Sequence, residues 1–184
     1  MEILVVDIET SGLHTKFSSI VEIGLVLVNT KTKTIKTLFD KVIRESNFKP
    51  NYKPTPWIFI NSDLTVNDVL NAQSLDSYKD ELQGYFDKYP LTAFNKKFDL
   101  RFLRDRGFEI KEIKCLMEST KSYFTVRNKN GSIKGPSVME AYGILFPGEK
   151  YIEKHRGGDD AKHEAKILLE LVRLNEKQKL LIEN

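Results

Sequence analysis

The sequence predicts an α/β fold in which a mixed β-sheet is flanked by α-helices. Three strand-like segments lie at the N-terminal end, and helical segments alternate with short strands through the rest of the chain. At 184 residues, 40% of them hydrophobic, the chain has room for one well-buried core. We therefore expect one domain covering residues 1–184.

The first three expected strands form an antiparallel meander. Residues 3–8 and 20–29 are apolar runs rich in β-branched side chains, which is typical of buried strands. Residues 34–44 alternate polar and apolar side chains, as a strand with one exposed face does. Residues 46–66 hold three of the six prolines, so we expect an irregular excursion there.

Helices and further strands, expected to run parallel to the first, follow the meander. Residues 75–89 have helical spacing, and residues 91–94 are typical of a buried strand. Asn95 is placed to act as the N-cap of the next helix. In the final third we expect a strand at 113–117, a helix at 117–126, a basic turn at 127–136, and helices at 136–145 and 159–174.

Composition excludes several classes of protein. The net charge is only +3, so a nucleic-acid-binding face would have to come from local clustering, and the basic turn 127–136 is either such a face or a solvated loop. Cys115 is the only cysteine, which excludes an intramolecular disulfide and a cysteine-based zinc site; we expect it to be a buried apolar residue. No apolar stretch approaches 18 residues and no secretory leader is evident, so we expect a cytoplasmic protein without a membrane association.

Two acidic residues end the first expected strand. Asp7 and Glu9 are two residues apart, so both side chains project from the same face of the sheet. A chain with 26 acidic residues contains about one Asp-x-Glu by chance, so the position of the pair matters more than its occurrence. Burial of two carboxylates beside an apolar strand is unfavourable unless a cation compensates their charge. Carboxylate oxygens are ligands that suit Mg²⁺ or Mn²⁺. An exposed pair at a sheet edge is the alternative.

A third acidic residue, Asp99, lies in the first turn of the helix that begins at Asn95. Its neighbours Phe98 and Leu100 are apolar, so a carboxylate here requires a partner. Asp99 therefore either belongs to a site or simply interacts with the dipole at the helix N-terminus.

The last acidic cluster stands where the C-terminal helix begins. Helical geometry directs Asp160 toward the core, whereas Asp159 shares the water-facing side with His163. Packing does not explain a core-facing acid at a helix start, and His155 precedes it on a loop that we expect to be flexible because of its glycines. Asp160 and His155 are therefore the candidates for chemistry in this cluster.

Three segments in this order resemble the motifs of the DEDDh exonuclease superfamily. They are DIETSGL at 7–13, NKKFD at 95–99 and HRGGDDA at 155–161. The histidine class of this superfamily places its histidine five residues before the last aspartate, as His155 stands before Asp160. The resemblance covers nearly the whole chain and implies an RNase H-like fold.

The resemblance implies a metal-dependent 3′→5′ exonuclease that releases 5′-mononucleotides from DNA or RNA. Two divalent cations, Mg²⁺ or Mn²⁺, are held in such enzymes by four carboxylates, which correspond here to Asp7, Glu9, Asp99 and Asp160. Asp7 is implied to bridge the cations, and His155 to act as the general base.

The resemblance also implies the contacts of the substrate. Thr10, Leu13, Asn95 and Phe98 are the implied substrate-binding residues, with Leu13 and Phe98 enclosing the terminal bases. The implied partner is a nucleic-acid 3′ end, and association as a homodimer or with a polymerase is left open. Gly157 and Gly158 depart from the Ala and Leu that relatives often carry, and we expect them to loosen the segment that presents His155.

Two other functions are compatible with such a sheet. A nucleic-acid-binding module with a degenerate site would be expected to lack one of the acids or the histidine, and all five are present. An endonuclease or phosphatase would not require the histidine segment. A circular substrate separates these from an exonuclease, which needs a free end.

Overall fold

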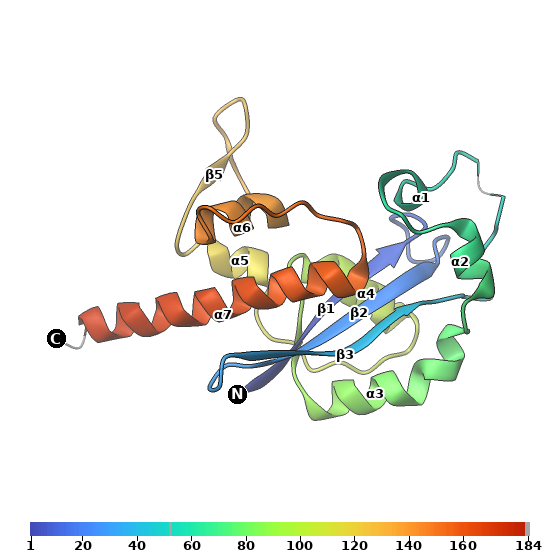
Figure 1. The fold of residues 1–184 in the computed structure, drawn as a ribbon, viewed down its shortest axis with the longest axis horizontal. Helices are drawn as coiled ribbons and strands as arrows, with labels where there is room; N and C mark the ends of the chain where they lie inside the picture. The colour runs from blue at the N-terminus through green and yellow to red at the C-terminus, as the bar shows by residue number, and fades with distance from the viewer. Residues whose placement is uncertain (52, 183–184) are drawn as a thin grey trace.

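A four-stranded mixed sheet forms the centre of the protein (Figure 1). The computed structural model describes residues 1–51 and 53–182. The strand order is β3-β2-β1-β4, in which β1 pairs antiparallel with β2, β2 pairs antiparallel with β3, and β4 runs parallel to β1. The mixed sheet with an N-terminal meander is thus confirmed. The bounds are β1 Glu2–Thr10, β2 Ile20–Asn29, β3 Thr34–Val42 and β4 Leu91–Thr92.

Helices flank this sheet, and the longest, α7, lies across β1, β2 and β3 (Figure 1). A small two-stranded hairpin, β5 with β6, stands apart from the main sheet. The bounds are α1 Ile58–Asn61, α2 Val66–Asn71, η1 Leu75–Tyr78, α3 Lys79–Lys88, α4 Lys96–Asp105, α5 Leu116–Thr120, β5 Val126–Arg127, β6 Ile133–Lys134, α6 Val138–Leu145 and α7 Gly157–Ile182.

The side chains of β1 divide between two apolar clusters on opposite faces of the sheet. Leu4, Val6 and Ile8 pack in the cluster that contains the buried side chains of α3 and α4. Ile3 and Val5 pack in the cluster that contains those of α5, α6 and α7. Strand alternation therefore directs Asp7 and Glu9, which continue the odd-numbered series, toward the face covered by α7.

The predicted strand 113–117 and the predicted helix 117–126 are both wrong in extent. The segment runs beside β4, but only Glu112 forms a bridge with Leu91, and Thr92 Oγ1 then donates to the Lys114 carbonyl in place of a regular ladder. α5 covers only five residues because the Thr120 carbonyl accepts from the amides of both Tyr123 and Phe124, which closes the helix in a turn.

Three other expectations need correction. The excursion 46–66 is not wholly irregular, since it contains α1, and a capping box between Thr65 and Asp68 starts α2 at its end. The basic turn 127–136 holds most of the β5–β6 hairpin, whose first strand begins at Val126. Helix α7 begins two residues before the predicted start at 159 and continues beyond 174.

Within the described residues, no helix is both long enough and apolar enough to cross a membrane.

Candidate active site

The two acids of β1 lie where this strand runs beneath the start of α7. Asp7 pairs with Gly24 of β2, and Glu9 pairs with Glu22. Burial, followed by the nearby charge of Glu9, raises the pKa of Asp7 well above its usual range. Burial, followed by the charge of Asp160, raises the pKa of Glu9 to about 9. Asp7 Oδ2 is buried without a hydrogen-bond partner among the described residues.

Asp99 is brought to the same place by the first turn of α4. Its side chain is 5% exposed, and its Oδ1 accepts a hydrogen bond from the Ile8 amide at 3.3 Å. Burial raises the pKa of Asp99 to about 7. Asn95 stands at the N-cap position as predicted, but its exposed side chain makes no capping bond, so that part of the prediction is wrong.

Asp160, which is 2% exposed, faces the sheet from α7 as predicted. Its Oδ1 accepts from the Tyr151 hydroxyl at 2.6 Å, and its Oδ2 accepts from the Arg156 amide at 3.0 Å. Asp159 and His163 are half-buried, not on an open water-facing side. The segment before α7 contacts both: the ring of Tyr151 stacks on that of His163 at 4.1 Å between centroids, and Lys154 Nζ lies 3.3 Å from Asp159 Oδ1.

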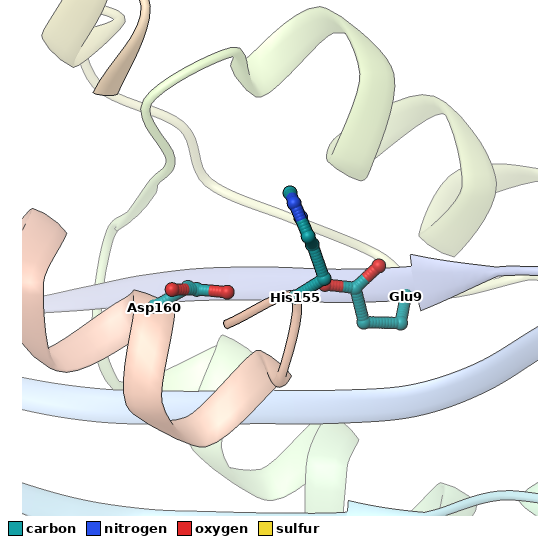
Figure 2. A group of neighbouring side chains, drawn as sticks. All are labelled: Glu9, His155 and Asp160. Atoms are coloured by element: carbon teal, nitrogen blue, oxygen red, sulfur yellow. The ribbon is translucent and has the colours of Figure 1, made fainter. Parts of the chain in front are cut away.

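His155 stands between two of the acids. Glu9, His155 and Asp160 each offer an atom that can bind a metal, and these atoms lie within 4.8 Å of one another. Figure 2 shows that the three side chains come from β1, from the segment before α7 and from α7. His155 has a φ of 54°, a left-handed conformation. Its Nδ1 is 4.0 Å from Glu153 Oε1, and its ring packs edge-on against Trp57 at 4.5 Å between centroids.

The sequence predicts that Gly157 and Gly158 loosen this segment, and the structure shows that this prediction is wrong. Both belong to the first turn of α7, which lies directly on the sheet. A Cβ on Gly158 would lie 2.1 Å from the carboxyl carbon of Asp40, and one on Gly157 would lie 2.8 Å from the Gly24 amide. The glycines therefore permit close packing between helix and sheet.

An ion pair ties the residue after His155 to the sheet. The Arg156 guanidinium donates to both carboxylate oxygens of Glu22, at 2.8 to 3.1 Å, and to Asp63 at 2.7 Å. Glu22 is 1% exposed, and its Oε2 also accepts from the Gly157 amide at 3.2 Å. This bidentate contact fixes the backbone between His155 and α7.

A pocket of about 450 Å³ lies beside the acids. Of the predicted substrate-binding residues, Thr10, Leu13 and Phe98 line it, and Asn95 does not. Its remaining lining comes from Glu9, Gly12, Trp57 and Ile58.

Sequence reasoning missed several residues of this region. Glu164 is buried one helical turn after Asp160, and that spacing of four could have revealed it. Glu153 stands only two residues before His155, a spacing that the sequence shows. Trp57 and Glu22 reach the site through packing between distant segments, for which the sequence carries no local signal.

The donor set fits a divalent cation. Hard oxygen ligands are those that Mg²⁺ and Mn²⁺ prefer, and the unpartnered Asp7 Oδ2 lacks the compensation that a cation provides. Burial raises the pKa values of Asp7, Glu9 and Asp99, and mutual repulsion between acids adds to the shifts of Asp7 and Glu9.

Residues 4–168 match the RNase T exonuclease family. The chain belongs to this family and, with it, to the DEDDh exonuclease superfamily. It is thus a member of a family of nucleases that use divalent cations. No curated protein sequence matches the chain.

Solved structures of exonucleases share the fold. A full-length 3′-exonuclease superimposes with a TM-score of 0.71 and 17% identity, over 95% of this chain and 61% of its own length. The nuclease domain of 3′hExo, a DEDDh family member bound to rAMP, superimposes with a TM-score of 0.70 and 19% identity, over 94% of this chain and 92% of its own length. E. coli Exonuclease I in complex with a dT13 oligonucleotide superimposes with a TM-score of 0.72 and 12% identity, over 97% of this chain and 42% of its own length. The chain thus spans less than two thirds of the first and third proteins, and the likeness establishes the RNase H-like fold.

Proposed function

We propose that residues 1–184 form one 3′→5′ exonuclease domain that releases 5′-mononucleotides from the 3′ end of DNA or RNA. The observation that carries this proposal is the convergence of Glu9, His155 and Asp160, whose ligand atoms lie within 4.8 Å of one another. Family membership supports the reaction class, and the solved 3′-exonucleases support the direction.

Four carboxylates would hold the cations. Asp7, Glu9 and Asp160 approach one another from β1 and α7, and Asp99 reaches the end of β1 from α4. Two Mg²⁺ or Mn²⁺ ions supply charge that stabilises the phosphodiester oxygens and lowers the pKa of water. The four side chains bind and space that charge, and Tyr151 and the Arg156 amide orient Asp160.

His155 acts as the general base. A ring nitrogen takes a proton from the attacking water, the water oxygen bonds to phosphorus, and the bond from phosphorus to the leaving 3′ oxygen breaks. That oxygen then takes a proton from solvent. Glu153 Oε1 lies 4.0 Å from His155 Nδ1, and Trp57 supports one side of the ring.

The pocket beside Glu9 receives the end of the chain. Leu13 and Phe98 present apolar surface that can stack on any base, and Thr10 and Glu9 lie where the terminal hydroxyl would enter. Trp57 and Ile58 extend this wall from the excursion 46–66. Such a pocket binds an end without reading its sequence, which suits stepwise removal of nucleotides.

The direct test compares linear and circular single strands of the same sequence. We expect a ladder of shortened products from a 5′-labelled linear strand in Mg²⁺ or Mn²⁺ and an intact circle. Cleavage of the circle would instead indicate an endonuclease. No cleavage of either strand under any cation would favour a binding module with a degenerate site.

A further inference from the structure

Glu164 is a buried carboxylate that the proposed mechanism does not use. It lies on α7 four residues after Asp160, so both side chains leave the same face of the helix. Glu164 is 3% exposed, although glutamate is almost never buried without a paired charge. A reason for retaining this charge is therefore required.

One hydrogen bond fixes Glu164 beside the segment that carries Asp99. Its Oε2 accepts from the Phe94 amide at 3.0 Å, a bond between positions 70 residues apart. Phe94 lies between β4 and α4, and Asp99 is in the first turn of α4. Glu164 thus connects the helix that presents Asp160 to the segment that presents Asp99.

The surroundings of Glu164 are acidic. Asp99, Asp160 and Glu153 are close enough to repel its charge, and Asp7 belongs to the same group of acids. An amide side chain could accept from the Phe94 amide equally well without this repulsion, so hydrogen bonding alone does not account for a carboxylate here.

An independent observation indicates a cation in the same place. Asp7 Oδ2 is buried without a hydrogen-bond partner among the described residues, and the charge of Glu164 acts on Asp7. A carboxylate that is unfavourable in the absence of a cation becomes favourable when a cation binds nearby.

We propose that Glu164 is a fifth carboxylate of the metal centre, a positioning residue whose negative charge, held beside Asp99 by the Phe94 amide, strengthens binding of the cation that Asp99 supports. This inference rests on the proposed function, because that function assigns Asp99 to a cation.

Two substitutions separate the charge of Glu164 from its hydrogen bond. Glu164→Gln keeps the acceptor for the Phe94 amide and removes the charge, whereas Glu164→Asp keeps the charge and shortens the side chain. Glu176→Gln, at an exposed glutamate of the same helix, is the matched control. Melting temperature is measured in EDTA and then against rising Mn²⁺, and nucleotide release is measured over the same Mn²⁺ range.

We expect Glu164→Gln to melt above the wild type in EDTA and to need at least about 10-fold more Mn²⁺ for half-maximal stabilisation, as loss of a residue next to the ligands does. Its rate of nucleotide release should recover at high Mn²⁺. Glu164→Asp should need less Mn²⁺ than Glu164→Gln, and Glu176→Gln should match the wild type.

The reverse order, with Glu164→Asp weaker for Mn²⁺ than Glu164→Gln, would show that only the hydrogen bond matters and would overturn the proposal. If Glu164→Gln fails to fold, Glu164→Asp decides alone: Mn²⁺ affinity within about threefold of the wild type supports the charge, and a loss of about 10-fold or more overturns it. A wild type that is stabilised by Mn²⁺ but releases no nucleotide would contradict the proposed function and leave this comparison of affinities intact.

Discussion

Gly24 of β2 and Gly157 of α7 pack backbone against backbone: a Cβ on Gly24 would lie 2.0 Å from the Gly157 carbonyl oxygen. Asp7 is the β1 partner of Gly24, and His155 lies two residues before Gly157. This contact therefore sets the depth at which α7 and the segment before it approach the acids of β1.

Gly24→Ala is expected to destabilise the protein by about 3 kcal/mol or more, because the new methyl group meets backbone that has no room to move. Chemical denaturation of the variant measures this loss. Gly84→Ala is the matched control: no atom lies within 4 Å of its Cβ position in α3, and alanine should stabilise that helix by about 0.5 to 1 kcal/mol. Equal stability of the two variants would contradict the packing argument.

Arg156→Ala is expected to cost about 2 to 3 kcal/mol of stability, because the buried Glu22 carboxylate then keeps, among the described residues, only the Gly157 amide as a hydrogen-bond donor. It should also slow nucleotide release, since the backbone next to His155 loses its anchor. Arg104→Ala removes an ion pair with Glu112 that is exposed on both sides and should cost less than about 1 kcal/mol. Urea denaturation of both variants, with the rate measured under native conditions, tests this difference.

Trp57→Ala is expected to lower kcat/KM about 5- to 10-fold through loss of the edge contact to His155 and of one wall of the pocket. Because Trp57 is 57% exposed, the melting temperature should change little. Trp57→Phe keeps an aromatic ring and should recover most of the activity. A Trp57→Ala protein with wild-type kinetics would remove Trp57 from the site.

Stability without cations should fall as the pH rises. The pKa of Glu9 is raised in the folded protein from 4.5 to about 9, so its contribution is fully present below about pH 4.5 and is lost as the pH rises through about 9. The pKa of Asp99 is raised from 3.8 to about 7, so its contribution to the unfolding free energy is present below about pH 3.8 and is lost as the pH rises through about 7. We expect the unfolding free energy in EDTA to fall by at least about 2 kcal/mol between pH 5 and 9.

Cations should reverse this trend, because they bind the deprotonated carboxylates and so stabilise the folded state more at higher pH. Glu9→Gln is the control: its stability in EDTA should fall less steeply with pH than that of the wild type. A stability in EDTA that rises over pH 5 to 9, or a slope that Glu9→Gln leaves unchanged, would contradict these assignments.

Local patterns predicted the parts of the fold that depend on local geometry. Alternation and β-branched runs identified β1, β2 and β3, and the same alternation placed Asp7 and Glu9 on one face. Helical geometry correctly distinguished the buried Asp160 from Asp159. Each of these predictions needs only the period of a single element.

Predictions that depended on a second segment were less successful. Gly157 and Gly158 were interpreted as sources of flexibility because the sequence does not show that Gly24 and Asp40 lie opposite them. The place of Trp57 beside His155 depends on how the excursion 46–66 folds back on the sheet. Glu164 is a different case. Its spacing of four residues from Asp160 is visible in the sequence, but only the structure shows that it is buried.

The most direct measurement of the central claim is the rate at which mononucleotide is released from 3′-labelled DNA and RNA by the wild type and by Asp7→Asn, each in Mg²⁺, Mn²⁺ and EDTA. The substitution removes the charge of Asp7 at nearly constant size. We expect 5′-mononucleotide from the wild type with either cation, none in EDTA, and a loss of at least about 1000-fold in Asp7→Asn that remains folded by its melting curve. Full activity of the wild type in EDTA, or of Asp7→Asn in Mg²⁺, would contradict the account.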